Sequence, residues 1–181
     1  MMIRKGFVLC LLVLVFSTLR GQDPQFSQYY ASPLYLNPGF AGTTPKYRVS
    51  LQSRIQWPSL PQAYVTHAFS LDANLDKFNS GFGILATNDR AGSAALQTSA
   101  IGLLYSYKFY IGKQFVLSPG LNFSYGMRNI DKNKLLSTDQ IQFSGTGIPP
   151  TVDPDLLNLR NVSYFDFAFG TVIYNPKMWF G

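Results

Sequence analysis

The segment Lys46-Tyr-Arg-Val-Ser-Leu-Gln-Ser-Arg-Ile-Gln-Trp57 decides the fold class, because its side chains alternate in polarity from one residue to the next. The odd positions are Tyr47, Val49, Leu51, Ser53, Ile55 and Trp57, and the even positions are Lys46, Arg48, Ser50, Gln52, Arg54 and Gln56. A period of two predicts a β-strand with one apolar face and one polar, cationic face. A strand of this length, tilted by about 40°, rises roughly 25 Å, which is the height of the apolar band of an outer-membrane barrel.

Further strands are expected along the rest of the chain. They lie at residues 62–71, 80–87, 96–109, 114–127 and 161–174, and residues 178–181 begin another. Their connections alternate between short turns (72–79, 111–113 and 175–177) and other links (58–61, 88–93 and a long loop at 128–160). Bacterial barrels place short turns in the periplasm and longer loops outside the cell. We therefore expect a periplasmic N-terminus and an extracellular loop at 128–160.

The composition favours strands over helices. The chain has 15 Phe, 11 Tyr and 2 Trp, and only 13% of its residues are charged, whereas roughly a quarter are charged in an ordinary soluble domain. Glutamate is absent, so helices stabilised by Glu–Lys pairs are hard to build. No stretch after Gly21 approaches the roughly 18 apolar residues of a membrane-spanning helix. We predict an all-β chain that forms the N-terminal portion of an antiparallel outer-membrane β-barrel over residues 46–181.

Residues 1–21 have the pattern of a secretory signal peptide. Arg4 and Lys5 precede an unbroken apolar run at residues 7–16, and small or polar residues follow. This run is too short to span a bilayer as a helix. Cys10 lies inside the run, so the chain after cleavage has no cysteine and no disulfide.

Several classes of function find no support in the residues. The chain carries 15 basic and 9 acidic residues, but the basic ones are scattered singly, which argues against nucleic-acid binding. His67 is the sole histidine, and its alternation with Val65 and Phe69 predicts a lipid-facing position. No serine lies in a Gly-x-Ser-x-Gly sequence. We expect no enzyme activity, no cofactor and no metal.

Charged residues also occur on the faces expected to line the barrel lumen. Arg48, Arg54 and Asp166 belong to this group, and charge is tolerated there because it meets water or an opposite charge. They either form a structural salt-bridge network or belong to a binding or gating surface. The pattern of residues leaves both interpretations open.

The predicted strands number six with the start of a seventh, whereas a spanning barrel closes with at least eight. We therefore expect the sequence to be a truncated piece of a longer barrel, or the barrel to need another chain for closure.

The segment Gln22-Asp-Pro-Gln-Phe-Ser-Gln-Tyr-Tyr-Ala-Ser-Pro-Leu-Tyr-Leu-Asn-Pro-Gly-Phe-Ala-Gly-Thr43 resembles the N-terminus of the PorP/SprF family of type IX secretion system membrane proteins. The pattern Arg54-x-Gln-Trp-Pro58 resembles the same family. The signature residues are Asp23, Pro24, Gln25, Phe26, Ser27, Gln28, Asn37, Pro38, Gly39, Trp57 and Pro58. The resemblance covers the whole chain after residue 21.

This resemblance implies an outer-membrane barrel of Bacteroidota that assists export or surface anchoring of large secreted adhesins, used in gliding or attachment. The implied partners are outer-membrane lipid, other type IX secretion components and a secreted surface adhesin. A passive porin is the alternative function, and a barrel enzyme is a third hypothesis.

The signature segment also has a physical interpretation. Three prolines, Pro24, Pro33 and Pro38, forbid a long helix, and Asn37-Pro-Gly39 suits a turn. We expect residues 22–45 to form an irregular periplasmic cap. Its aromatic residues Phe26, Tyr29, Tyr30, Tyr35 and Phe40 would pack it under or into the barrel mouth.

Overall fold

The computed structural model describes residues 26–59, 63–92, 96–112, 114–131, 135 and 160–181. The predicted signal peptide at 1–21, the signature residues Asp23, Pro24 and Gln25, and nearly all of the predicted loop at 128–160 lie outside the described residues.

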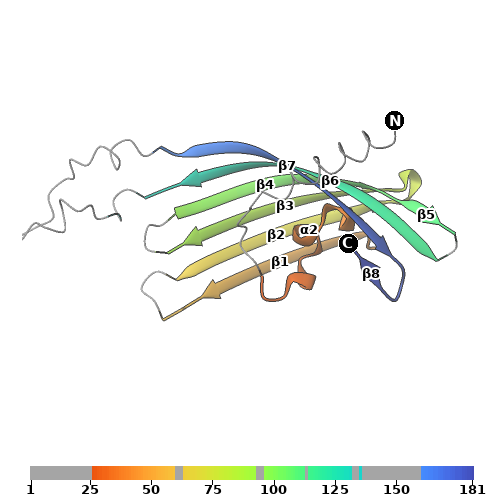
Figure 1. Ribbon diagram of the computed structural model, residues 1–181, viewed down its shortest axis with the longest axis horizontal. Helices are drawn as coiled ribbons and strands as arrows, with labels where there is room; N and C mark the ends of the chain where they lie inside the picture. The colour runs from red at the N-terminus through yellow and green to blue at the C-terminus, as the bar shows by residue number, and fades with distance from the viewer. Residues whose placement is uncertain (1–25, 60–62, 93–95, 113, 132–134, 136–159) are drawn as a thin grey trace, which may run out of the picture.

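The structure is an all-β antiparallel sheet of eight strands that curls into a half-barrel (Figure 1). The strands are β1 (Tyr47–Gln56), β2 (Tyr64–Leu75), β3 (Ser80–Ala91), β4 (Leu96–Tyr107), β5 (Phe109–Ile111), β6 (Phe115–Asn129), β7 (Val162–Tyr174) and β8 (Trp179–Phe180). Their order is β1-β2-β3-β4-β6-β7-β8, and β5 pairs with β6. The predicted fold class is confirmed.

Three short helical turns make up the described part of the cap: η1 (Tyr29–Ala31), α2 (Pro33–Leu36) and η2 (Pro38–Phe40). A fourth turn, η3 (Asp76–Phe78), joins β2 to β3. Pro33 and Pro38 each begin a turn, where a missing N–H costs nothing, and so keep the helices short. No helix in the described ranges is long and apolar enough to cross a membrane.

Two predicted connections are wrong in their bounds. The turn predicted at 72–79 begins only after Leu75, and the loop predicted at 88–93 begins only after Ala91. Aspartate and asparagine are common in turns, but these two lie within strands. Asp72 of β2 pairs with residues of β1 and β3, and Asn88 of β3 pairs with residues of β2 and β4. The strand predicted at 96–109 also breaks at Lys108, which separates β4 from the short strand β5.

The cap lies on one face of the sheet, which we call the inner face (Figure 1). Four buried residues, Leu34 and Ala41 of the cap with Leu85 and Leu104 of the sheet, form the core between them, and Tyr35 packs against it. Phe26 and Phe40 are also buried, as the aromatic packing of the cap requires. Tyr29 and Tyr30 are exposed, so the expectation that they pack the cap is wrong.

The opposite face, the outer face, is apolar and exposed. On β1, Leu51 exposes 77% of its surface, and on β7, Phe167 exposes 75%. The Phe123 ring of β6 contacts the rings of Phe165 and Phe167 of β7. Large apolar side chains turned out of a sheet are costly in water. The sequence alternation therefore produces a sheet whose apolar side faces outward and whose polar side faces the cap.

Candidate functional site: the cap and the inner face

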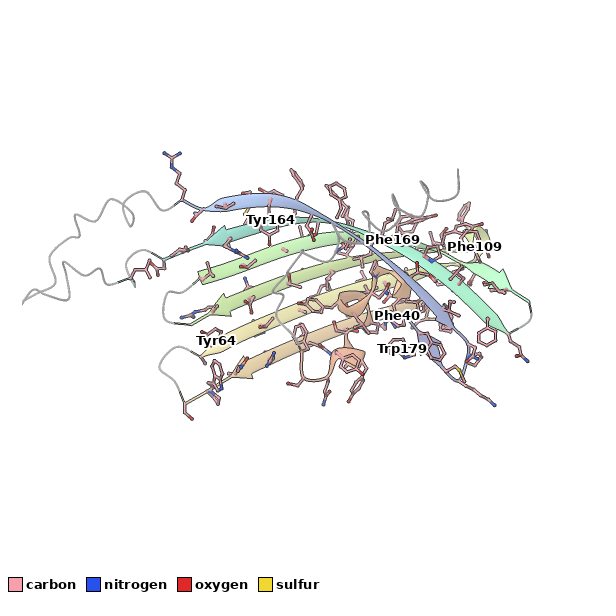
Figure 2. All side chains as sticks on the ribbon, in the orientation of Figure 1. Phe40, Tyr64, Phe109, Tyr164, Phe169 and Trp179 are labelled. Atoms are coloured by element: carbon pink, nitrogen blue, oxygen red, sulfur yellow. The ribbon has the colours of Figure 1, made fainter. Side chains whose placement is uncertain are left out.

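The signature residues Asn37, Pro38 and Gly39 form a turn that fixes the cap to β7. The side-chain oxygen of Asn37 accepts a hydrogen bond from the Gly39 N–H at 2.8 Å, and its amide nitrogen donates to the Thr171 carbonyl at 3.3 Å. The Phe40 ring packs edge-on against Trp179 of β8, with ring centroids 5.1 Å apart (Figure 2). This motif therefore joins the cap to the last two strands of the described sheet.

The next stretch of the cap is held through its backbone carbonyls. Each one from Gly39 to Gly42 accepts a hydrogen bond from an inner-face side chain. The donors are Ser118 Oγ to Gly39 at 2.8 Å, Arg48 Nη2 to Phe40 at 3.1 Å, Ser106 Oγ to Ala41 at 2.7 Å, and Lys108 Nζ to Gly42. Buried backbone carbonyls need hydrogen-bond partners. The donors come from three different strands or strand ends, so all four carbonyls find their partners only in one position of the cap.

A charge pair supports the same contact. Arg48 Nε donates to Asp72 Oδ1 at 2.9 Å, and Asp72 Oδ2 accepts from the Gly42 N–H at 2.8 Å. Asp72 is only 1% exposed, so its charge is stabilised by Arg48 and by these hydrogen bonds rather than by water.

Glycines under the cap allow its backbone to approach the sheet. A Cβ added at Gly81 would overlap the Ala41 carbonyl, one at Gly120 would overlap the backbone of Pro38 and Gly39, and one at Gly170 would overlap the Asn37 side chain. We call the inner face beneath the cap the covered half. Its residues are Arg48, Asp72, Gly81, Ser106, Ser118, Gly120 and Gly170.

The rest of the inner face, the open half, forms a groove of about 1080 Å³ that ends against the cap residues Leu34 to Pro38. Tyr64 and Tyr164 lie at the far end of the sheet from Phe40 (Figure 2). The groove lies at the end of the sheet where β1, β3 and β6 end and the connections to β2, β4 and β7 begin. Its polar lining residues are Arg54, Gln56, Tyr64, Thr66, Thr87, Asp89, Thr98, Asn122, Ser124, Arg128, Tyr164 and Asp166.

The three charged residues singled out from the sequence all lie on the inner face, but in different places. Arg48 belongs to the covered half, where it pairs with Asp72 rather than with Asp166. Arg54 and Asp166 line the groove. The three side chains therefore do not form one shared ion-pair network.

Other signature residues lie at the margins of the sheet. The buried Phe26 packs edge-on against Tyr35, and the Gln28 carbonyl lies 3.5 Å from Gln52 Nε2 of β1. Trp57 follows β1 with a left-handed backbone (φ 55°) and contacts Tyr64, with ring centroids 5.3 Å apart, while Pro58 follows it in the chain. These residues fix the cap margin and the first hairpin.

His67 lies on the exposed outer face of β2, between Val65 and Phe69, as its alternation predicts. It therefore points away from both the cap and the groove.

Sequence reasoning missed the residues that hold the cap: Asp72, Ser106, Lys108 and Ser118. Asp72 continues the inward series Thr66, Ala68 and Ser70 on β2, and this alternation is the signal that could have identified it. The serines carry no such signal, because their role depends on where the cap docks.

One comparison with known proteins decides the family. The family model described as type IX secretion system membrane protein PorP/SprF matches residues 18–181. This chain belongs to the PorP/SprF family. The match confirms the resemblance to this family, and the Asn37-Pro38-Gly39 turn shows what three of the predicted PorP/SprF signature residues do in the fold. No curated protein and no solved structure matches the chain.

Proposed function

We propose that this PorP/SprF protein is an outer-membrane component of the type IX secretion system that assists export or surface anchoring of large secreted adhesins. Family membership carries the proposal, because the family consists of type IX secretion system membrane proteins. The adhesin, a role in gliding or attachment, and an origin in Bacteroidota belong to the same proposal. Other type IX components are its expected partners.

The outer face supports a position in the lipid of the outer membrane. Most of its large exposed side chains from β1 to β7 are apolar, and His67 and Arg90 are among the exceptions. In a bilayer, such a face meets hydrocarbon while the backbone groups are satisfied by the neighbouring strands. An export signal at residues 1–21 would bring the chain to this membrane.

A passive porin is the alternative function. It would need a continuous water-filled passage along the inner face. The cap argues against this, because it lies against β4, β6 and β7 and is fixed there by hydrogen bonds from Ser106 and Ser118.

Deleting the gene in the source bacterium and measuring the secreted proteins by mass spectrometry tests the proposed function. We expect a defined group of large exported proteins to disappear from the medium or cell surface, and to return when the gene is restored. Reconstitution of the purified protein in planar bilayers tests the alternative. An unchanged set of secreted proteins together with steady ion conductance would favour the porin.

A further inference from the structure

The open half of the inner face contains a row of polar side chains that crosses five strands. Strand register places each residue directly opposite the next: Arg54 on β1, Thr66 on β2, Asp89 on β3, Thr98 on β4 and Arg128 on β6. We call these five residues the polar row. Thr66 Oγ1 donates to Asp89 Oδ1 at 2.5 Å, which holds the central carboxylate in place.

Small residues lie beside the polar row, between it and the cap. Ala68, Thr87, Ala100 and Gly126 are opposite one another on consecutive strands of the sheet, and Gly102 faces Ser124 in the next row. Of these residues, Thr87, Ala100, Gly102 and Ser124 line the groove of about 1080 Å³, and their short side chains leave space in it. This volume lies just above the range of about 300–1,000 Å³ that is typical of ligand sites.

The covered half shows what such a surface binds in this molecule. There, glycines leave room for a polypeptide backbone, and serine and charged side chains donate to its consecutive carbonyls. The open half has the same two ingredients, small residues and hydrogen-bonding side chains, and adds charges of both signs. We propose that the open half binds an extended segment of an exported polypeptide along the polar row, an inference that rests on the proposed function.

The charge pattern of the polar row specifies the segment. Adjacent strands lie about 4.8 Å apart, so Arg54 and Arg128 are each about 10 Å from the central Asp89 along the sheet. An extended chain in the polyproline II conformation rises about 3.1 Å per residue and has three residues per turn, so side chains three residues apart lie about 9 Å apart on the same side. The complementary segment therefore carries an acidic residue, a basic residue three positions later, and a second acidic residue after three more.

Mixed charge also argues for polypeptide over a polyanion. Asp89 and Asp166 both line the groove with Arg54 and Arg128. A phosphorylated glycan or lipid headgroup would bring its negative charges toward these carboxylates, and like charges repel. A segment of alternating charge avoids this repulsion.

The test uses the whole protein in detergent micelles and two fluorescein-labelled peptides. The first peptide is Asp-Gly-Ser-Lys-Gly-Ser-Asp, and the second, Lys-Gly-Ser-Asp-Gly-Ser-Lys, has the charges reversed. Fluorescence anisotropy should show tighter binding of the first peptide. Each of Arg54→Gln and Arg128→Gln should weaken that binding about two- to fivefold, as expected for a partly exposed ion pair.

Arg90→Gln is the matched control. Arg90 follows Asp89 on β3 but lies on the outer face, so this substitution removes the same charge without touching the polar row. Its binding should equal that of the unchanged protein. Equal weakening by Arg90→Gln would indicate a general charge effect and overturn the inference.

A second variant blocks the groove only after the protein has folded. In a Cys10→Ser background, Ser124→Cys provides one thiol in the groove, and a bulky thiol reagent added after assembly should abolish binding of the first peptide. The same reagent on Phe123→Cys, one residue away on the outer face, should have no effect. Binding that survives the block at residue 124 would overturn the inference.

Two further results decide the ligand class and separate this inference from the proposed function. The inference would be overturned if both peptides bound equally or if neither bound. It would also be overturned if purified lipopolysaccharide displaced the first peptide and its own binding were weakened to the same extent by Arg54→Gln. If gene deletion abolishes secretion and the peptides bind equally, only the groove assignment fails. If deletion leaves secretion unchanged, the function on which the inference rests fails, whatever the peptides show.

Discussion

The covered and open halves of the inner face are built from the same strands but have different surroundings. On β6, Ser118 and Gly120 are buried beneath the cap, whereas Ser124 and Arg128, a few residues further on, line an open groove. On β1, Arg48 is held by Asp72 and the Phe40 carbonyl, and Arg54 lies in the groove. One alternating pattern thus supplies both a structural contact and a surface available for binding.

The difference shows what determines the role of a polar inner-face residue. A hydroxyl or a charge beneath the cap is part of the fold, because a cap backbone group depends on it. The same kind of group in the open half lines the groove, whereas the cap carbonyls from Gly39 to Gly42 accept their hydrogen bonds from side chains beneath the cap. Substitutions should therefore affect stability in one half and binding in the other.

The largest effect is expected at Asp72. Asp72→Ala removes the partner of Arg48 and the acceptor of the Gly42 N–H. It should lower the free energy of unfolding by about 3–5 kcal/mol, as does the loss of one member of a buried ion pair. Asp166→Ala in the open half should change it by less than about 0.5 kcal/mol. Urea unfolding in lipid vesicles, followed by tryptophan fluorescence, measures both. Similar losses at the two sites would remove the distinction between the halves.

The outer face should not show this division. Leu103 lies behind the covered half and Ile101 behind the open half, and both are exposed on β4. Leu103→Arg and Ile101→Arg should each lower barrel stability by about 2–4 kcal/mol if both side chains meet hydrocarbon. The control is Ala100→Arg, on the inner face beside Ile101, which should be close to neutral. Equal costs at residues 100 and 101 would remove the assignment of the outer face to lipid.

Much of the sheet could be predicted from alternation, because each strand has one apolar and one polar side. Alternation assigned Leu51 to the outer face and Arg48, Arg54 and Asp166 to the inner face. The residues at which strands end were harder to predict. Asp72 looks like a turn residue, and only its tertiary partners Arg48 and Gly42, 24 and 30 residues earlier in the chain, explain why it lies inside a strand.

The position of the cap could not be predicted for a related reason. Prolines and the Asn37-Pro38-Gly39 turn indicate a short, irregular segment, but not the surface on which it docks. Docking depends on Gly81, Gly120 and Gly170 being aligned across strands. Register between strands creates this alignment, and register is not contained in any one strand's pattern.

A smaller effect is expected from adding one methyl group to β6. Gly120→Ala would place a Cβ against the backbone of Pro38 and Gly39, which cannot move without releasing the cap. It should cost about 1–3 kcal/mol, the usual range for overpacking. Gly126→Ala is the matched change in the open half, where the three atoms nearest the added Cβ belong to the far end of the Tyr164 side chain, which can rotate. Protease sensitivity of the N-terminal segment should rise in the first variant alone. A cap that stays protected in Gly120→Ala would show that this contact does not fix it.

The smallest difference is expected between two serines of the same strand. Ser118 Oγ donates to the Gly39 carbonyl at 2.8 Å in a fully buried site, so Ser118→Ala leaves that carbonyl without this donor. The expected cost is about 1 kcal/mol, the typical net contribution of one hydrogen bond. Ser124 lies on the same face six residues later but lines the groove, and Ser124→Ala should change stability by less than about 0.5 kcal/mol. Amide hydrogen exchange of residues 39–42 provides the more sensitive measurement, since local release of the cap speeds exchange before the whole sheet unfolds. Faster exchange in Ser118→Ala but not in Ser124→Ala is the predicted result. Faster exchange in both would mean that the two halves unfold as one unit, and that the cap is coupled to the groove.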